Sequence, residues 1–183
     1  YVVEIDMLFL STYINKVDKK GRVSVPAQFR DVLEGEKFQG IIIYRSFIND
    51  ALEACGLGRM QRLSESIDRL DPYSEERDAF AATILGGSSQ LPFDSEGRII
   101  LPSDLIEKFS ITDKVTFVGK GPSFEIWESQ KFNDYLSFMT TLRSLREAVV
   151  FNESHNVLAR SNISFSLEFE PVSQEAVDQA HRG

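Results

Sequence analysis

The stretch "DKKGRVSVPAQF" (18–29) decides the fold, because the chain writes it a second time as "DSEGRIILPSDL" (94–105). At an offset of 76 residues (18 to 94), Asp, Gly, Arg and Pro recur, and apolar residues stand at the first and third positions after Arg. An ordered series of this kind is typical of an internal duplication. The sequence therefore predicts two copies of one structural unit.

The register between the copies continues towards the C-terminus with shorter offsets. "GIIIYRS" (40–46) matches "KVTFVGK" (114–120), and "ALEAC" (51–55) matches "SFEIW" (123–127) at an offset of 72. The first copy therefore holds about four extra loop residues.

Each copy predicts the same order of elements. A strand (13–17 or 90–93) leads into the D-x-x-G-R turn, where Gly supplies a positive φ, and a second strand ends at Pro. A short helix (27–33 or 103–109) follows, and two more strands close the unit.

The two units are expected to share one core. A unit of about 45–50 residues buries too little surface to be stable alone. We predict an α+β, mainly β fold: a pseudo-dimeric, swapped-hairpin β-barrel made from two internal repeats, with flanking helices. The expected segments are the first repeat (7–56), a helical connector (57–88), the second repeat (89–135) and a C-terminal helix with its extension (136–183).

Helical periodicity marks three further segments, 60–70, 74–85 and 129–150. In the last of them an apolar stripe is open to two interpretations, core packing or a subunit interface; its members are Phe132, Leu136, Met139, Leu142 and Leu145. Alternation over 162–171 predicts one strand, and the polar residues after it have no readable role. Met7 is a candidate natural start.

Composition is that of an ordinary globular protein, with 42% hydrophobic and 26% charged residues. The single Cys55 excludes an internal disulfide framework. No apolar run approaches the roughly 20 residues that span a bilayer, so we expect no membrane partner and a cytoplasmic location. A net charge of −8 disfavours nucleic acid unless positive charge is concentrated locally.

The first turn is such a concentration. Lys16, Lys19, Lys20 and Arg22 lie within seven residues, opposed only by Asp18. Alternation places Arg22 and the residue two further on at the open face of the strand, and a basic two-stranded ribbon fits the DNA major groove. The alternative is a charged turn that serves solubility alone.

The second turn has less positive charge, because Ser95 and Glu96 replace the lysines. Either Arg98 acts alone in that half, or the half is mainly scaffold. We expect Asp18 and Asp94 to cap turn N–H groups and to orient the following arginines, which is a structural role.

These motifs resemble the MraZ family of bacterial regulators, which are built from two SpoVT-AbrB-type half-domains. The matching stretches are "FLSTYINKVDKKGRVSVPAQFR" (9–30), "FDSEGRIILPSDLIEKF" (93–109) and "VTFVGKGPSFEIW" (115–127). The resemblance implies ring-like homo-oligomers, a nucleoid-associated location, and control of the division and cell-wall gene cluster by binding repeated boxes in duplex DNA upstream of the chain's own operon. The implied DNA-binding residues are Lys16, Lys19, Lys20, Gly21, Arg22, Gly97 and Arg98.

Glu96 departs from the neutral or basic residue more usual in this family, and residues from about 150 onward lie outside the resemblance. Two other classes of protein compete with this interpretation. An enzyme is disfavoured because no nucleophile, phosphate-loop or metal-ligand spacing is present; "GKGP" (119–122) is a simple turn, and His155 and His181 stand apart from other ligand types. We expect no cofactor, metal or small-molecule substrate. A protein-assembly module without DNA binding remains the alternative.

Overall fold

The computed structural model describes residues 8–146, 149–151 and 157–160. The chain forms two compact units, Tyr1–Phe132 and Asn133–Gly183. The first unit covers the segments expected as the first repeat and the connector and most of the segment expected as the second repeat (89–135), and the second unit contains most of the last helix and two short strands. Among the described residues, no helix is long and apolar enough to cross a membrane.

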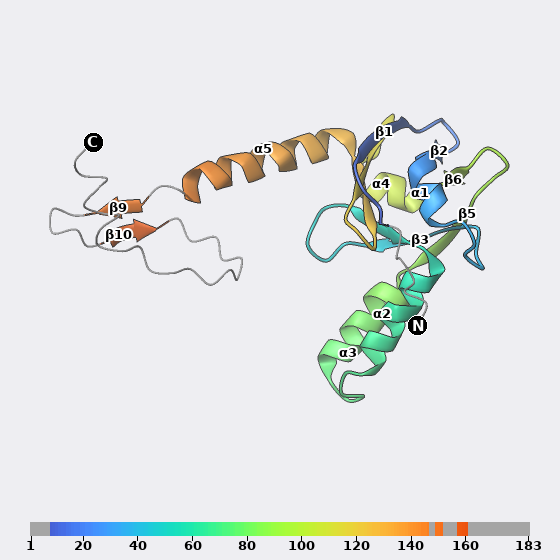
Figure 1. Cartoon of the computed structure of the whole chain (residues 1–183), viewed down its shortest axis with the longest axis horizontal. Helices are drawn as coiled ribbons and strands as arrows, with labels where there is room; N and C mark the ends of the chain where they lie inside the picture. Colours follow the sequence, from blue (N-terminus) through green and yellow to red (C-terminus); the bar gives the residue numbers. More distant parts are fainter. Residues whose placement is uncertain (1–7, 147–148, 152–156, 161–183) are drawn as a thin grey trace. The chain divides into compact units, whose positions relative to one another are not determined.

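An antiparallel six-stranded sheet forms the centre of the first unit (Figure 1). Its order is β1 (Thr12–Lys16), β7 (Lys114–Gly119), β8 (Phe124–Glu128), β4 (Leu52–Cys55), β3 (Gly40–Arg45) and β5 (Ser89–Pro92). A separate two-stranded ribbon pairs β2 (Arg22–Ser24) with β6 (Arg98–Ile100). With helices flanking the sheet, the fold is α+β and mainly strands, as the sequence predicts.

Strand register shows that the repeats are related by a local two-fold axis. In β4 and β8, Glu53 stands opposite Glu125, its own counterpart at an offset of 72. In the ribbon, Val23 stands opposite Ile99, its counterpart at an offset of 76. Because each residue faces its mate, the axis passes through both pairs, and the duplication predicted from the sequence is a pseudo-dimer.

One pairing differs from the simplest interpretation of the sequence, in which 13–17 and 22–25 form one basic hairpin ribbon. β1 and β2 meet only at the single bridge between Val17 and Val23, and β2 takes its partner from the other repeat. Because β2 pairs with β6, the side chains of Val23 and Ile99 lie next to each other in the shared core, where they are 1% and 0% exposed. Burial of both apolar residues from water favours this pairing over a local hairpin.

A single core collects apolar residues from both repeats, as expected for units too small to stand alone. Phe29 of α1 (Ala27–Val32) is fully buried, and its ring lies 5.3 Å from Phe9 and 4.8 Å from Phe124. The matching helix α4 (Ser103–Lys108) packs Leu105 and Ile106 against the same core. Aromatic rings from both repeats therefore meet at the centre of the unit.

The connector forms a helical hairpin that projects from the sheet beside β3 (Figure 1). It consists of α2 (Leu57–Asp68), α3 (Glu75–Phe80) and the π-helix η1 (Ala81–Gly86). The predicted helix over 74–85 is thus divided between α and π geometry. Ser74 caps the start of α3, since its Oγ accepts the Arg77 N–H at 3.2 Å.

The helix predicted by periodicity over 60–70 is confirmed, and one face of it is apolar. Met60 and Ile67 are 8% and 6% exposed and pack with Ile84 against Ile42 and Tyr44 of the sheet. The connector is therefore anchored to the sheet by a second, smaller core.

The C-terminal helix is shorter than predicted. α5 spans Ser129–Arg146, whereas Val149–Phe151 forms strand β9, which pairs with β10 (Val157–Arg160). The β-branched and aromatic run "VVF" favours a strand over continued helix. The strand predicted at 162–171 and the candidate start at Met7 lie outside the described residues.

The apolar stripe of α5 is buried only at its start. Phe132 is 7% exposed, whereas Leu136 and its neighbour Phe138 are 47% and 59% exposed. Core packing therefore accounts for Phe132 but not for Leu136. The side chains at 142 and 145 lie outside the described residues.

Candidate nucleic-acid interface

In the first D-x-x-G-R loop, the carboxylate of Asp18 binds backbone N–H groups through one oxygen and a guanidinium through the other; we call this arrangement the aspartate brace. Its Oδ1 accepts the backbone N–H groups of Lys20 (2.8 Å) and Arg22 (2.9 Å). Its Oδ2 accepts Nε of Arg22 at 2.7 Å and lies 2.6 Å from Nη2 of the same guanidinium. One carboxylate therefore closes the turn and holds the arginine, as the sequence predicts.

The second loop repeats this brace with one addition. Asp94 Oδ1 accepts the N–H groups of Glu96 and Arg98, each at 2.9 Å, and Oδ2 accepts Arg98 Nε at 2.8 Å. Glu96 Oε2 lies 2.7 Å from Nη1 of Arg98. This guanidinium is therefore held by two carboxylates, whereas that of the first loop is held by one.

The braces perturb the titration of both aspartates. The backbone N–H of Arg22, and then its guanidinium, lower the pKa of Asp18 to about 2. The corresponding groups of Arg98 lower the pKa of Asp94, and the pKa of Arg98 is raised, chiefly by its bond to Asp94. The carboxylates stay ionised at neutral pH and keep the turns closed.

The ribbon brings the two arginines together on one face. Arg22 stands opposite Ile100, and Ser24 stands opposite Arg98, so the two guanidinium groups leave diagonally adjacent positions about 7–8 Å apart at Cα. The side chains of Arg22 and Arg98 are 35% and 26% exposed. The alternation predicted for 22–25 is confirmed, because Val23 and Val25 are buried while Ser24 is exposed.

The lysines predicted for the site surround the first loop only. Lys16, Lys19 and Lys20 are exposed, and among the described residues none of them forms an ion pair. The second loop has Ser95 and Glu96 at the positions of Lys19 and Lys20. The positive charge of the ribbon is therefore concentrated at one end.

The two glycines predicted for the site are buried, and they serve the conformation of the turns. Gly21 and Gly97 are buried, with φ of +76° and +71°. Their N–H groups donate to the carbonyls of Asp18 and Asp94 at 2.9 and 3.0 Å. Their part in the site is to allow the left-handed turn.

Sequence reasoning missed two residues of this region. Arg30 donates from Nε to the Val25 carbonyl at 3.2 Å, and its guanidinium lies in the space that the absent side chain of Gly97 leaves. Ile100, 60% exposed, stands on the outer face of the ribbon, opposite Arg22 and two residues after Arg98. Arg30 could have been found from the repeat, because its counterpart at an offset of 76 is the apolar Ile106.

Other reactive or charged side chains in the interior of the first unit have structural roles. Burial raises the pKa of the Cys55 thiol to about 12, so this side chain behaves as a core residue. Trp127, 3% exposed, donates to the buried Glu125 at 2.8 Å, and Lys120 binds the same carboxylate at 2.7 Å. The described residues contain no group of three or more His, Cys, Asp or Glu that could hold a metal.

The fold and the loops together define a class of protein: an internally duplicated α+β protein that displays two aspartate-braced arginines on one ribbon. Comparison with known proteins identifies it further. The family model "MraZ protein, putative antitoxin-like" matches residues 8–49 and 84–148. The chain belongs to the MraZ family.

The relatives agree in name. A "Transcriptional regulator MraZ" of Rickettsia bellii (strain OSU 85-389) is 56% identical over 131 residues, which cover 71% of this chain and 87% of the relative. Proteins of the same name from Rickettsia felis (strain ATCC VR-1525 / URRWXCal2) and Rickettsia canadensis (strain McKiel) are each 53% identical over 130 residues, covering 71% of this chain and 87% of theirs. The resemblance inferred from the sequence is confirmed, and neither the family nor these relatives bear the name of an enzyme.

Proposed function

We propose that this protein is a sequence-specific DNA-binding transcriptional regulator that reads duplex DNA with the β2–β6 ribbon. The observation that carries the proposal is the placement of Arg22 and Arg98 on one open face by matching aspartate braces. A two-stranded ribbon fits the major groove, where an arginine can pair with both acceptors of a guanine. Bracing reduces the side-chain entropy that such a contact would otherwise cost.

The surrounding residues have complementary roles in this proposal. Lys16, Lys19 and Lys20 contact phosphates and set the register of the ribbon on the duplex. Ile100 offers an apolar contact of the kind that a thymine methyl group accepts. The first loop provides most of the affinity, because Glu96 competes with DNA for Arg98 in the second loop.

A ring-like homo-oligomer accounts for DNA binding by a chain with a net charge of −8. A single basic loop binds weakly, but several loops on one assembly gain effective concentration when they face repeated sites. The target that the family resemblance implies has this form: short repeated boxes upstream of the chain's own operon, in the division and cell-wall gene cluster. Binding there would give the protein a cytoplasmic, nucleoid-associated location.

We further infer that sheet and ribbon together form the swapped-hairpin barrel expected from the repeats. Support comes from the exchange of strands across the local axis and from the single core that both repeats share. In this proposal the first repeat spans 7–56, the connector 57–88, the second repeat 89–135, and the C-terminal helix with its extension 136–183.

The test is a titration of the purified chain against DNA upstream of its own gene, with a scrambled duplex as control, at several salt concentrations. If two or three chains each make about two phosphate contacts, the log–log salt slope is expected near −4 to −5. Lys19→Ala should weaken binding to both duplexes alike. Absent or salt-independent binding would leave the assembly module without DNA binding as the better description. Equal, salt-dependent binding to the two duplexes would contradict sequence specificity.

A further inference from the structure

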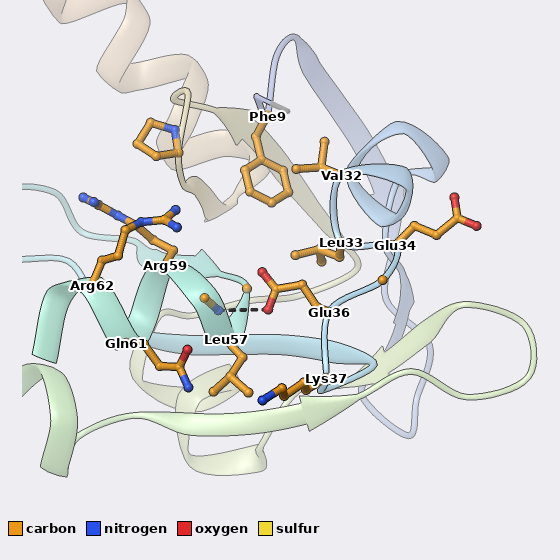
Figure 2. Close-up of a pocket in the computed structure, with 14 residues that line it drawn as sticks. Phe9, Val32, Leu33, Glu34, Glu36, Lys37, Leu57, Arg59, Gln61 and Arg62 are labelled. Carbon is orange, nitrogen blue, oxygen red and sulfur yellow. Dashed lines mark hydrogen bonds between the residues drawn. The ribbon is translucent and has the colours of Figure 1, made fainter. Parts of the chain in front are cut away.

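A pocket outside the ribbon carries the next inference. It has a volume of about 480 Å³ and opens where the first turn of α2 meets the segment that follows α1 (Figure 2). Its apolar wall includes Phe9, Val32 and Leu33, and Arg59 and Arg62 lie side by side at its edge in Figure 2. The pocket therefore joins an apolar surface to a basic edge; we call it the basic pocket.

Two carboxylates and a lysine also line the basic pocket. Glu36 accepts the Gly58 N–H at 2.9 Å and so caps the start of α2 (Figure 2). Glu34 and Lys37 stand on the same segment as Glu36. The lining therefore holds three cations and two carboxylates, an excess of one positive charge.

Comparison of the repeats shows what the basic pocket lacks. At an offset of 72, Arg59 corresponds to Lys131, and both are the third residue of a helix, α2 from Leu57 and α5 from Ser129. Lys131 Nζ binds Asp50 Oδ2 at 2.6 Å. Among the described residues Arg59 has neither a hydrogen bond nor an ion pair, and its buried Nε has no partner.

Loop length explains this difference. The β3–β4 loop has six residues (46–51) and brings Asp50 to Lys131, whereas the β7–β8 loop has four (120–123). The shorter loop contributes Pro122 to the basic pocket and no carboxylate. Next to Lys131 the chain itself supplies an acid, whereas the corresponding loop offers none to Arg59.

A matching acidic surface lies at the other end of α2. The turn 71–76, "DPYSEE", carries Tyr73, 96% exposed, between the exposed acids Asp71, Glu75 and Glu76. Asp71 Oδ1 accepts the Tyr73 N–H at 2.9 Å, and the Ser74 hydroxyl donates to the Asp71 carbonyl at 2.8 Å. We call this turn the acidic tip; its hydrogen bonds fix the backbone that carries Tyr73.

The acidic tip and the basic pocket of one chain cannot meet, because the 12 residues of α2 separate them by about 18 Å. We propose that the acidic tip of one copy of this chain docks in the basic pocket of a second copy. The Tyr73 ring packs on the apolar wall, and Glu75 or Glu76 supplies the carboxylate that Arg59 lacks. Such a contact is head-to-tail, which generates rings when the rotation closes; the proposal rests on the ring-like oligomer of the proposed function.

The experiment measures the mass of the full chain by light scattering across a concentration series. Tyr73→Ala removes the tip and Arg59→Glu reverses the pocket, and each is expected to weaken self-association by roughly 30-fold or more. An equimolar mixture of the two variants retains one good tip and one good pocket. It should form dimers of the 20.7 kDa chain and nothing larger.

Glu65→Arg is the matched control, because it reverses an exposed charge on the same helix outside both surfaces and should keep the parent mass. Arg59→Gln replaces Arg59→Glu if circular dichroism shows that the latter does not fold. A parent-like mass for Tyr73→Ala, or a mixture that stays monomeric, would overturn the proposal. A monomeric parent would overturn the ring as well, whereas loss of DNA binding is detected separately in the titration above, since all these variants leave the ribbon intact.

Discussion

The loops 18–22 and 94–98 share one backbone and differ in charge. Both close with an aspartate that accepts two N–H groups and the following guanidinium, and both turn through a glycine of positive φ. The side chains at the two positions between Asp and Gly do not bind the aspartate, and they are two lysines in one loop and Ser95 and Glu96 in the other. Conformation and charge are thus set by different residues of the same five.

The loops also differ in what lies beneath their glycines. A methyl group at Gly21 would lie 2.9 Å from the Leu101 carbonyl oxygen and 3.0 Å from Ile106 Cδ1. One at Gly97 would lie 2.6 Å from Cζ and 2.8 Å from Cδ of Arg30. An added methyl group would therefore meet a backbone carbonyl in the first loop. In the second loop it would meet the long side chain of Arg30, which can move.

The largest expected effect follows from this difference. Gly21→Ala should lower the free energy of unfolding by about 2–4 kcal/mol, from left-handed strain and a contact that cannot relax. Gly97→Ala should cost only about 1–2 kcal/mol, because Arg30 can swing aside. Chemical denaturation measures both. Gly35→Ala, at φ +85° with open space around it, isolates the strain alone; equal losses for Gly21→Ala and Gly97→Ala would contradict the distinction.

The second prediction compares the arginines in DNA binding. Arg22→Ala should reduce discrimination between the operator and a scrambled duplex by about 1–3 kcal/mol for each base pair that the guanidinium reads. Arg98→Ala should have a smaller effect, because Glu96 and Asp94 already hold that guanidinium. Fluorescence anisotropy with both duplexes measures the difference. A larger effect for Arg98→Ala would reverse the proposed order of the loops.

The third prediction makes the loops alike in charge. Glu96→Lys removes the carboxylate from Arg98 and adds a cation near the phosphates, so affinity for any duplex should rise several-fold. The magnitude of the salt slope should grow by about 1. The same anisotropy titration at three salt concentrations measures it. Glu65→Arg changes net charge by the same amount away from the ribbon, and an equal gain for this control would indicate a general charge effect.

The smallest effect concerns protonation of the braces. Because the pKa of Asp18 is lowered to about 2, the brace contributes stability above the ordinary value of 3.8 and loses it as pH falls towards 2. Carboxyl-carbon NMR should show this titration. In Arg22→Ala the pKa should rise only part of the way to 3.8, since the backbone N–H of residue 22, the larger cause, remains. A full return to 3.8 would assign the shift to the guanidinium instead.

Much of this architecture could be predicted from the sequence because the repeat is local and strict. Offsets between the copies predicted the order of elements, and alternation over 22–25 predicted which side chains face the core. The four extra residues of the first copy prove to be divided between two loops, 33–39 and 46–51, each two residues longer than its counterpart. The fall in offset from 76 (18 to 94) to 74 (40 to 114) and then to 72 (51 to 123) corresponds to these two loops.

Other features escaped prediction for a physical reason. The partner of β2 is a strand 76 residues away, and no local pattern distinguishes it from β1. The helix over 129–150 ends at Arg146, since periodicity alone does not show where strand propensity takes over. Arg30 reaches the second loop only because the two-fold exchange carries α1 there.

The amino-acid order alone established duplication, family membership, and which five residues build each turn, because these properties depend on neighbours along the chain. The pairing of β2 with β6 decided that both guanidinium groups share one face. Loop length decided that Lys131, at the start of α5, binds Asp50, whereas Arg59, at the start of α2, has no such acid. Contacts of the second kind join residues distant in sequence, and burial of a common core selects them.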